Sequence, residues 1–318
     1  MSGVRRTSVI VPARNEGVRI GRLVGAVRAQ RPAGEELEVI VVDDGSTDDT
    51  AAAATAAGAR VLAIPRQPSG GNPAAARNQG AAAATGDLLV FLDADCLPAD
   101  GWLPTLLAGH DAGEEIVGGS FAAAPGLPAS ARCDYYTGWY HVHPRRPGGV
   151  VPNHPPGNLS VRRDLFLSTV GFTEAQPVAY AHEELAWQSQ LRRAGHRITF
   201  RPDAVVYHHN RPGVANLLRR NYRWAFSAIG SKAESDAARL RWVYRYPRLL
   251  AVAAVPIALV QTAYILLCWV RAGVLEPVLM LPWMLAAGVA YGAGMASGGR
   301  QWLRNRAHPA PFYRPRWE

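Results

Sequence analysis

Pairs of carboxylates stand at the ends of two apolar runs in the first hundred residues. Asp93 and Asp95 follow the run at 88–92, and Asp43 and Asp44 follow the run at 39–42. Such runs are typical of buried strands, and the carboxyl ends of parallel strands form the ligand-binding edge of an open α/β sheet. Oxygen ligands at positions i and i+2 suit Mg²⁺ or Mn²⁺, which neutralise a diphosphate. The two pairs therefore predict a metal-assisted nucleotide site.

A third strand end carries polar groups at residues 12–16, PARNE. At the second strand end, Gly45 with Ser46 or Thr47 is explained by a tight turn that caps the next helix. Capping does not explain the two adjacent acids Asp43 and Asp44, which can accept hydrogen bonds from a base N–H or a ribose hydroxyl. Three such ends at one edge favour a binding site over three unrelated turns.

Apolar periodicity predicts the elements that position these residues. Strands are expected at 8–12, 38–43, 61–64 and 87–92, with helices at 18–30, 46–57 and 73–84 between them. This alternation implies a parallel α/β sheet. Residues 125–156, dense in Pro, Gly, Tyr and His, predict a long loop that could act as a lid. A helix at 183–193, short strands at 198–200 and 205–207, and a helix at 214–229 complete the prediction.

Composition excludes several classes of protein. The 318 residues carry a net charge of +9, and only three cysteines, at 96, 133 and 268, which support neither a disulfide framework nor a zinc ribbon. The excess of basic residues lies after residue 238, whereas a nucleic-acid binder would spread a basic stripe over its folded domain. We therefore expect no nucleic-acid partner.

Two stretches near the C-terminus, 249–270 and 278–299, hold no charged residue over about 22 positions each. Arginines precede the first and follow the second, which predicts a membrane hairpin with both ends and the catalytic domain in the cytoplasm. A buried pair of helices in a soluble protein is the alternative. The helix at 214–229 mixes apolar residues with arginines, and either lies in a membrane interface or packs on the domain as an ordinary surface helix.

Five motifs resemble those of family 2 glycosyltransferases with the GT-A fold. They are SVIVPARNE at 8–16, VVDDGSTD at 41–48, ARNQG at 76–80, TGD at 85–87 and FLDAD at 91–95. The resemblance covers about residues 5–230 and implies a Rossmann-like nucleotide-diphospho-sugar transferase domain at 1–236. The two apolar stretches place a membrane anchor after it, at 237–318. The resemblance also implies a nucleotide-sugar donor, a divalent metal (Mg²⁺ or Mn²⁺) and transfer with inversion.

The same resemblance assigns roles to residues. The donor would be bound by Pro12, Ala13, Arg14, Glu16, Asp43, Asp44, Arg77, Asp93, Ala94 and Asp95. Asp95 would also bind the metal, with His208 as a further ligand; His208 is favoured over His209 because neighbours on a strand face opposite ways. Three more histidines, His141, His143 and His154, lack the cysteines or the i, i+4 spacing of a zinc site.

The second half of the chain resembles the family less tightly. The segment GNLSVR at 157–162 would shape the sugar and acceptor pocket, with Asn158 and Trp187 on the acceptor side. Glu183 and Glu184 match the catalytic acidic pair, except that Glu184 stands where Asp is common. Glu184 would deprotonate the acceptor hydroxyl; the alternative is that both acids only favour a helix N-terminus.

An anchored enzyme is expected to act on a lipid-linked or other membrane acceptor, which the membrane supplies at high effective concentration. Two rival functions remain at this point. One is a catalytically inactive GT-A domain that binds a sugar or a partner, against which the complete acidic set argues. The other is a nucleotidyltransferase, which would need a Gly-rich phosphate loop that residues 11–17 do not form.

Overall fold

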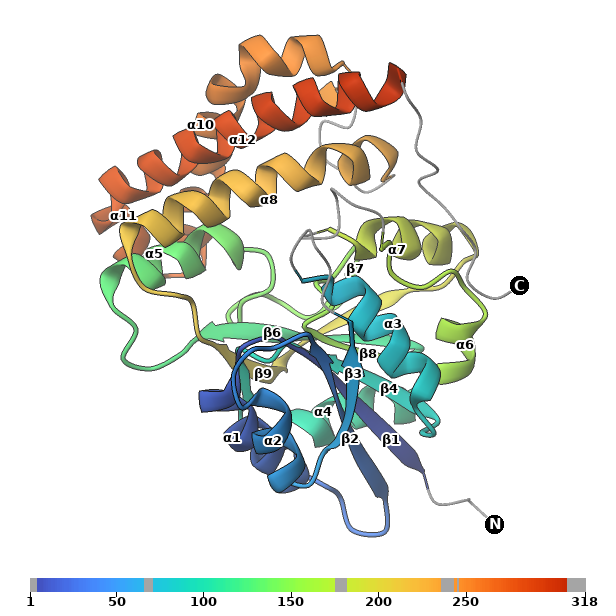
Figure 1. The fold of residues 1–318 in the computed structure, drawn as a ribbon. Helices are drawn as coiled ribbons and strands as arrows, with labels where there is room; N and C mark the ends of the chain where they lie inside the picture. The colour runs from blue at the N-terminus through green and yellow to red at the C-terminus, as the bar shows by residue number, and fades with distance from the viewer. Residues whose placement is uncertain (1–4, 66–70, 175–181, 236–242, 245, 308–318) are drawn as a thin grey trace.

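The computed structural model describes residues 5–65, 71–174, 182–235, 243, 244 and 246–307 (Figure 1). In these parts of the chain a nine-stranded sheet has the order β3-β2-β1-β4-β8-β6-β9-β5, with β7 paired to β9. The strands are β1 (Arg6–Ala13), β2 (Glu36–Asp44), β3 (Arg60–Ile64), β4 (Leu88–Leu92), β5 (Cys96–Pro98), β6 (Ile116–Ala123), β7 (Gly149–Val151), β8 (Asn158–Arg162) and β9 (Ile198–His208). The helices are α1 (Gly17–Arg28), α2 (Thr50–Ala56), α3 (Pro73–Ala83), α4 (Trp102–Asp111), α5 (Ala129–Gly138), α6 (Arg163–Leu167), α7 (Glu184–Arg193), α8 (Val214–Glu234), α10 (Pro247–Arg271), α11 (Glu276–Leu279) and α12 (Leu281–Ala307).

The sheet is parallel only in its first half. Strands β3, β2, β1 and β4 are parallel, as the sequence predicts, whereas β8 runs antiparallel to both β4 and β6. The parallel arrangement predicted from the first four strands is therefore confirmed, and β8 makes the complete sheet mixed. Residue Asn158 at the start of β8 pairs with Leu92 at the end of β4, so the chain returns to the sheet at the same edge where Asp93 leaves it.

Burial explains why β1 lies in the middle of this half. Val9, Ile10 and Val11 are fully buried, since helices cover both faces of the strand. Right-handed crossovers place α1 and α2 on one face and α3 on the other (Figure 1). The helix α3 approaches the sheet closely at Gly80, where an added Cβ would lie 2.4 Å from Ile10 Cγ2. This contact sets the position of α3 and of the site residue that it carries.

Three local predictions are corrected. Helix α2 begins at Thr50, and Ser46 does not cap it; the Ser46 hydroxyl instead accepts a hydrogen bond from the Asn15 backbone N–H at 3.0 Å. The segment 125–156 is not one long loop, because it contains the buried helix α5 and strand β7. The two short strands at 198–200 and 205–207 are one strand, β9, whose pairing with β6 shifts register between Gly119 and Ser120.

The C-terminal helices pack on the part of the chain that contains the sheet. Helices α10 and α12 form a hairpin that lies along α8 (Figure 1). Ile265, Trp269, Met284 and Ala287 belong to the same apolar core as the strands of the sheet. The boundary predicted at 236/237 and several of the predicted basic residues, at 239, 241, 245, 314 and 316, lie outside the described residues.

Among the described residues, one helical segment, Val252–Arg271, is long and apolar enough to cross a membrane. The second predicted span, 278–299, falls on α11 and α12 and does not meet that criterion. The two-span arrangement therefore stays a prediction.

Candidate active site

The turn after β4 presents the two carboxylates of the DAD motif. All five residues of β4 are buried, and the chain turns sharply at its end because the Cys96 N–H donates to the Asp93 carbonyl oxygen at 3.0 Å. Gly157 lies against this turn: a Cβ there would be 2.2 Å from Asp93 Oδ2. Only a glycine at 157 leaves space for the Asp93 carboxylate, so the motif GNLSVR is part of the site through its first residue.

A buried arginine connects this turn to α7. Arg77 on α3 is 4% exposed, and its guanidinium donates to Asp93 Oδ1 and to Glu183 Oε1, each at 2.5 Å. Burial lowers the pKa of Arg77, but the negative charges of Asp93 and Glu183 outweigh it and raise that pKa overall. The arginine therefore stays charged and holds two carboxylates from distant parts of the sequence at one place.

The acidic pair Glu183 and Glu184 lies at the start of α7, with both side chains at most 5% exposed. Glu183 pairs with Arg77, whereas Glu184 forms no ion pair with a described residue. Burial first, and then the charge of Glu183, raise the pKa of Glu184 to about 8. The residue before them, His182, has a φ of 69°, an uncommon backbone conformation for a residue with a side chain. A carboxyl group with a pKa close to neutrality is suited to accept a proton.

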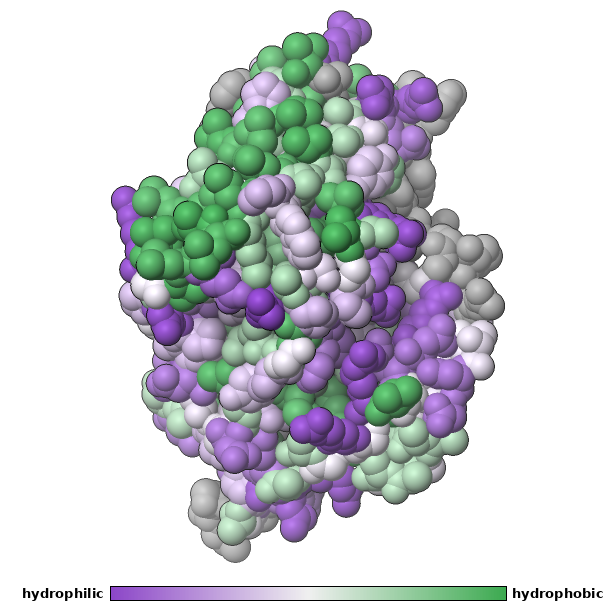
Figure 2. All heavy atoms as spheres, turned by 90° about the vertical axis from the view of Figure 1, so that its left-hand side faces the viewer, coloured by the Kyte–Doolittle hydropathy of each residue, from purple (hydrophilic) through white to green (hydrophobic). Residues whose placement is uncertain are grey.

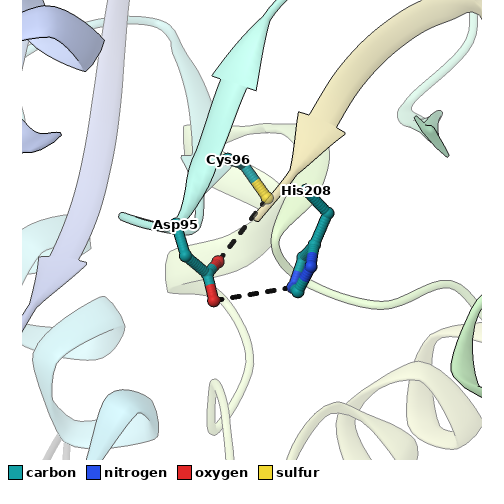
Figure 3. A group of neighbouring side chains, drawn as sticks. All are labelled: Asp95, Cys96 and His208. Carbon is teal, nitrogen blue, oxygen red and sulfur yellow. Dashed lines mark hydrogen bonds and ion pairs between the residues drawn. The ribbon is translucent and has the colours of Figure 1, made fainter. Parts of the chain in front are cut away.

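Asp95, Cys96 and His208 form the group that could hold a metal ion among the described residues (Figure 3). Asp95 Oδ2 lies 3.5 Å from His208 Nε2, and Cys96 Sγ lies 3.7 Å from Asp95 Oδ1. His208 and Cys96 are paired residues of β9 and β5, so the sheet itself places them side by side. The structure brings His208 next to Asp95, whereas His209 meets Asp95 only through its backbone N–H.

Hydrogen bonds behind His208 determine which ring nitrogen is free. The Asn210 amide donates to Asp134 Oδ2 at 2.7 Å, so the Asn210 Oδ1 atom faces His208 Nδ1 at 2.8 Å. An amide oxygen only accepts, so Nδ1 donates to Asn210, and Nε2 is the ring nitrogen that faces Asp95. A histidine oriented through its second nitrogen and a neighbouring carboxylate fit a divalent cation such as Mn²⁺. Sequence reasoning missed Asn210 and Asp134, because no motif links them to His208.

The predicted nucleotide residues lie at the ends of β1 and β2. Asp44 is 4% exposed; its Oδ2 accepts the Asn72 N–H at 2.5 Å, and its Oδ1 is buried with no hydrogen-bond partner among the described residues. Such an acceptor suits the N–H of a base. Asp43 instead closes its own turn by accepting the Ser46 N–H at 3.1 Å.

The residues of the first motif, 12–16, likewise differ in what they contribute to this edge of the sheet. The Arg14 guanidinium lies beside Asp44, since a Cβ at Gly71 would contact both side chains. Glu16 is 7% exposed and pairs with Arg19 at 2.9 Å and with Arg211 at 3.6 Å. Pro12 is half-buried, whereas Ala13 and Ala94 are buried and contribute backbone rather than side-chain surface to the edge.

Two residues predicted on the acceptor side lie in the interior. Asn158 is 0% exposed, accepts from Trp102 Nε1 at 2.7 Å and donates to two backbone carbonyls. Trp187 is 0% exposed and packs between Phe166 and Phe172, with ring centroids 5.3 and 5.1 Å away. Because neither side chain has exposed surface, neither can line the acceptor pocket in this structure. Their polarity and aromatic character serve the core.

The three histidines of the segment 125–156 do not form a zinc site with other described residues. His154 is fully buried between the Gly119 and Pro155 carbonyl oxygens, and burial lowers its pKa to about 4. Burial likewise lowers the pKa of His141 to about 3 and that of His143 to about 4.

A family comparison agrees with this geometry. Residues 8–168, about half of the chain, match the family described as Glycosyl transferase family 2. The chain belongs to glycosyl transferase family 2. This family match confirms the resemblance that the strand-end motifs indicate. The sheet and its acidic edge therefore belong to a glycosyltransferase family 2 domain.

Two curated relatives support this assignment to family 2. Glycosyltransferase AglE of Haloferax volcanii is 31% identical over 223 residues, which are 68% of this chain and 70% of AglE. The pre-mycofactocin glycosyltransferase of Mycobacterium tuberculosis is 29% identical over 234 residues, which are 70% of this chain. The chain spans 47% of the length of that relative.

A solved structure shares the fold of this family 2 member. It is the mannosyltransferase PcManGT from Pyrobaculum calidifontis, in complex with GDP-Man and Mn²⁺. The TM-score is 0.59 at 21% sequence identity, over 96% of this chain and 89% of that one. This similarity supports the GT-A architecture.

We expect Asp95→Ala to abolish metal-dependent binding of a nucleoside diphosphate and leave the fold intact, because the Asp95 side chain is 36% exposed. Calorimetry with UDP and with GDP, each with and without Mn²⁺, measures the effect. Asp100→Ala is the matched control, since Asp100 is an exposed acid five positions on. Metal-dependent affinity that persists in Asp95→Ala would show that Asp95 is not a ligand.

The raised pKa of Glu184 predicts a pH dependence of stability. The folded chain holds a proton on Glu184 up to about pH 8, because its pKa is raised, whereas the unfolded chain releases that proton near the ordinary glutamate pKa of 4.5. Protonated Glu184 therefore contributes to the free energy of unfolding at low pH, and this contribution is lost as the pH rises towards 8. Glu184→Gln cannot ionise, so urea unfolding should show this variant gaining stability relative to the unmodified chain between pH 5 and pH 8. A constant difference would contradict the shift.

Proposed function

We propose that this chain transfers a sugar from a nucleotide-sugar donor to a hydroxyl group of a lipid-linked or envelope acceptor, with inversion, at the cytoplasmic face of the cell membrane. The observation that carries the proposal is the cluster at the sheet edge: Arg77 holds Asp93 and Glu183 next to a carboxyl group, Glu184, whose pKa is raised. Donor residues and a proton acceptor thus meet in one place, as single displacement requires.

On the donor side, Asp44 offers an unpaired carboxylate oxygen to the base, and Asp93 offers its second oxygen to the ribose. Asp95 and His208 would hold a divalent cation, Mg²⁺ or Mn²⁺, which when bound supplies positive charge to offset that of the departing diphosphate. The related fold of PcManGT, solved with GDP-Man and Mn²⁺, supports this choice of ligands.

On the acceptor side, the ionised form of Glu184, which predominates only above about pH 8, takes the proton from the acceptor hydroxyl as that hydroxyl attacks the anomeric carbon. Glu183 cannot do so while it pairs with Arg77, so its role is to position the arginine. The burial of Glu184 keeps water from competing with the acceptor.

A membrane acceptor is favoured by the surroundings of the acidic pair. The ring of His182, two residues before Glu184, lies 5.9 Å from the ring of Trp224 on α8. Helix α8 in turn carries the apolar hairpin of α10 and α12. An acceptor supplied by lipid would therefore reach the proton acceptor along the side of the domain where the apolar helices lie.

Glu184→Gln should lower the transfer rate by about 10² to 10⁴, the contribution that general base catalysis makes, and leave donor affinity nearly unchanged. Glu184→Asp should keep part of the activity. The matched control is Glu183→Gln, which weakens the hold on Arg77 and should therefore also weaken donor binding. Initial rates at saturating donor, with a membrane lipid extract as acceptor, and calorimetric donor affinities separate the two roles. A large rate loss only at Glu183 would move the base by one residue.

Membrane attachment is tested by Val252→Glu combined with Val260→Glu, because these side chains are 83% and 71% exposed on α10 and make little contact within the chain. Binding of the full chain to vesicles should fall at least about tenfold, since each buried valine contributes roughly 1.5–3 kcal/mol. Val18→Glu, at a 96% exposed position on α1, is the control and should bind normally. Co-sedimentation measures both; equal binding of all variants would exclude α10 as the attachment surface.

A further inference from the structure

The connection between the two hairpin helices is tied to the catalytic domain. Glu276, at the start of α11, accepts from Arg132 Nε and from the Tyr136 hydroxyl on α5, each at 2.6 Å. Arg145 donates to the carbonyl oxygens of Ala272 and Gly273 at 3.2 and 3.0 Å. The turn at 271–276 therefore contacts the domain that carries the site.

The helices next to this connection pack on the same surface. Trp269 Nε1 on α10 donates to the Tyr136 carbonyl oxygen at 2.9 Å, and Met284 Sδ on α12 lies 3.6 Å from Cys133 Sγ. Trp269 and Met284 are at most 2% exposed. The connection end is thus held by a buried interface as well as by polar contacts.

The open end of the hairpin, which includes the C-terminal part of α12 at 294–300, also packs on the domain. A Cβ at Gly294 would be 2.1 Å from the Tyr222 carbonyl oxygen of α8, and one at Gly298 would be 2.5 Å from that of Phe226. Helices α8 and α12 therefore approach each other at backbone contact over two successive turns. Both ends of the hairpin are fixed to one domain, so the hairpin lies along it rather than projecting from it (Figure 1).

The opposite side of the hairpin is apolar and exposed. Figure 2 shows a broad hydrophobic area over the upper part of the molecule, where these helices lie. Its most exposed members are Val252 at 83%, Val260 at 71%, Leu275 at 64% and Leu279 at 83%. Exposed arginines border it at 248, 271 and 300. A contiguous apolar surface bordered by cations matches the boundary between acyl chains and anionic headgroups.

The two-span arrangement conflicts with these contacts. A spanning helix of about 20 residues would carry the connection roughly 30 Å away, to the far side of the bilayer. Arg132 and Tyr136 hold the connection on the near side. The alternative is that the C-terminal part of α12 crosses the bilayer. Helix α8 would then have to cross beside it, which would place the exposed arginines Arg219 and Arg223 in the acyl chains.

We propose that the α10–α12 hairpin does not cross the membrane and lies in the plane of an anionic bilayer surface, with its exposed apolar face among the acyl chains. This proposal rests on the membrane attachment in the proposed function. It places the catalytic domain, the connection and the open end on one side of the membrane.

Single cysteines introduced at three exposed positions test this arrangement in the full chain with Cys268→Ser as background, since Cys96 and Cys133 are buried. Val18→Cys marks the catalytic domain, Arg271→Cys the connection and Arg300→Cys the open end, since Arg271 and Arg300 are exposed polar positions outside the apolar face. Intact cells and inverted membrane vesicles are treated with a membrane-impermeant maleimide, with and without detergent. Nucleotide binding by each variant confirms that it is folded.

In-plane attachment gives labelling of all three positions in inverted vesicles and of none in intact cells. Labelling of Arg271→Cys alone from outside would establish the two-span hairpin, and labelling of Arg300→Cys alone from outside would establish a reversed one; either overturns the proposal. Recovery of the chain in the soluble fraction would contradict membrane attachment itself. Since none of these readouts uses sugar transfer, failure of the catalytic part of the proposed function is detected separately, by the rate measurements.

Discussion

The arrangement of the site depends on the buried ion pairs of Arg77. Its two carboxylate partners are 16 and 106 residues away in the sequence, one at the end of β4 and one at the start of α7. Burying a charge in this way is costly unless it is paired with good geometry, so the three groups are stable only together. The parallel half of the sheet and the helix with the acidic pair are thereby fixed relative to each other, and Asp93 stands at a constant position from Glu183 and Glu184.

This constraint also explains how two adjacent glutamates differ. Neighbouring residues at the start of a helix point about 100° apart, so only one of them can reach Arg77. Glu183 takes that position, and Glu184 is left buried beside a negative charge. Burial and then the charge of Glu183 raise the pKa of Glu184, and the positive charge of Arg77 opposes that rise.

Sequence patterns predicted the positions of the strand-end acids better than the structure around them. Asp44, Asp93 and Asp95 end apolar strands, a local signal that periodicity detects directly, and the side-by-side placement of His208 follows from strand pairing. Asn158 and Trp187 could not be placed, because a polar or large side chain that is buried in the core has no local signature. The antiparallel direction of β8 and the burial of α5 depend on contacts between distant segments. Hydropathy identified the two C-terminal apolar stretches, but it cannot show that Glu276 turns back to Arg132.

The glycines at 294 and 298 have a consequence for how this protein can change over evolution. They allow α12 to contact the backbone of α8, and the side chains of α10 and α12 complete the core beneath them. The apolar hairpin is therefore not a separable module, because its removal would expose the core residues that it covers. Replacement of the hairpin would require a new surface on α5 and α8, so the hairpin and the part of the chain that contains the sheet form one structural unit.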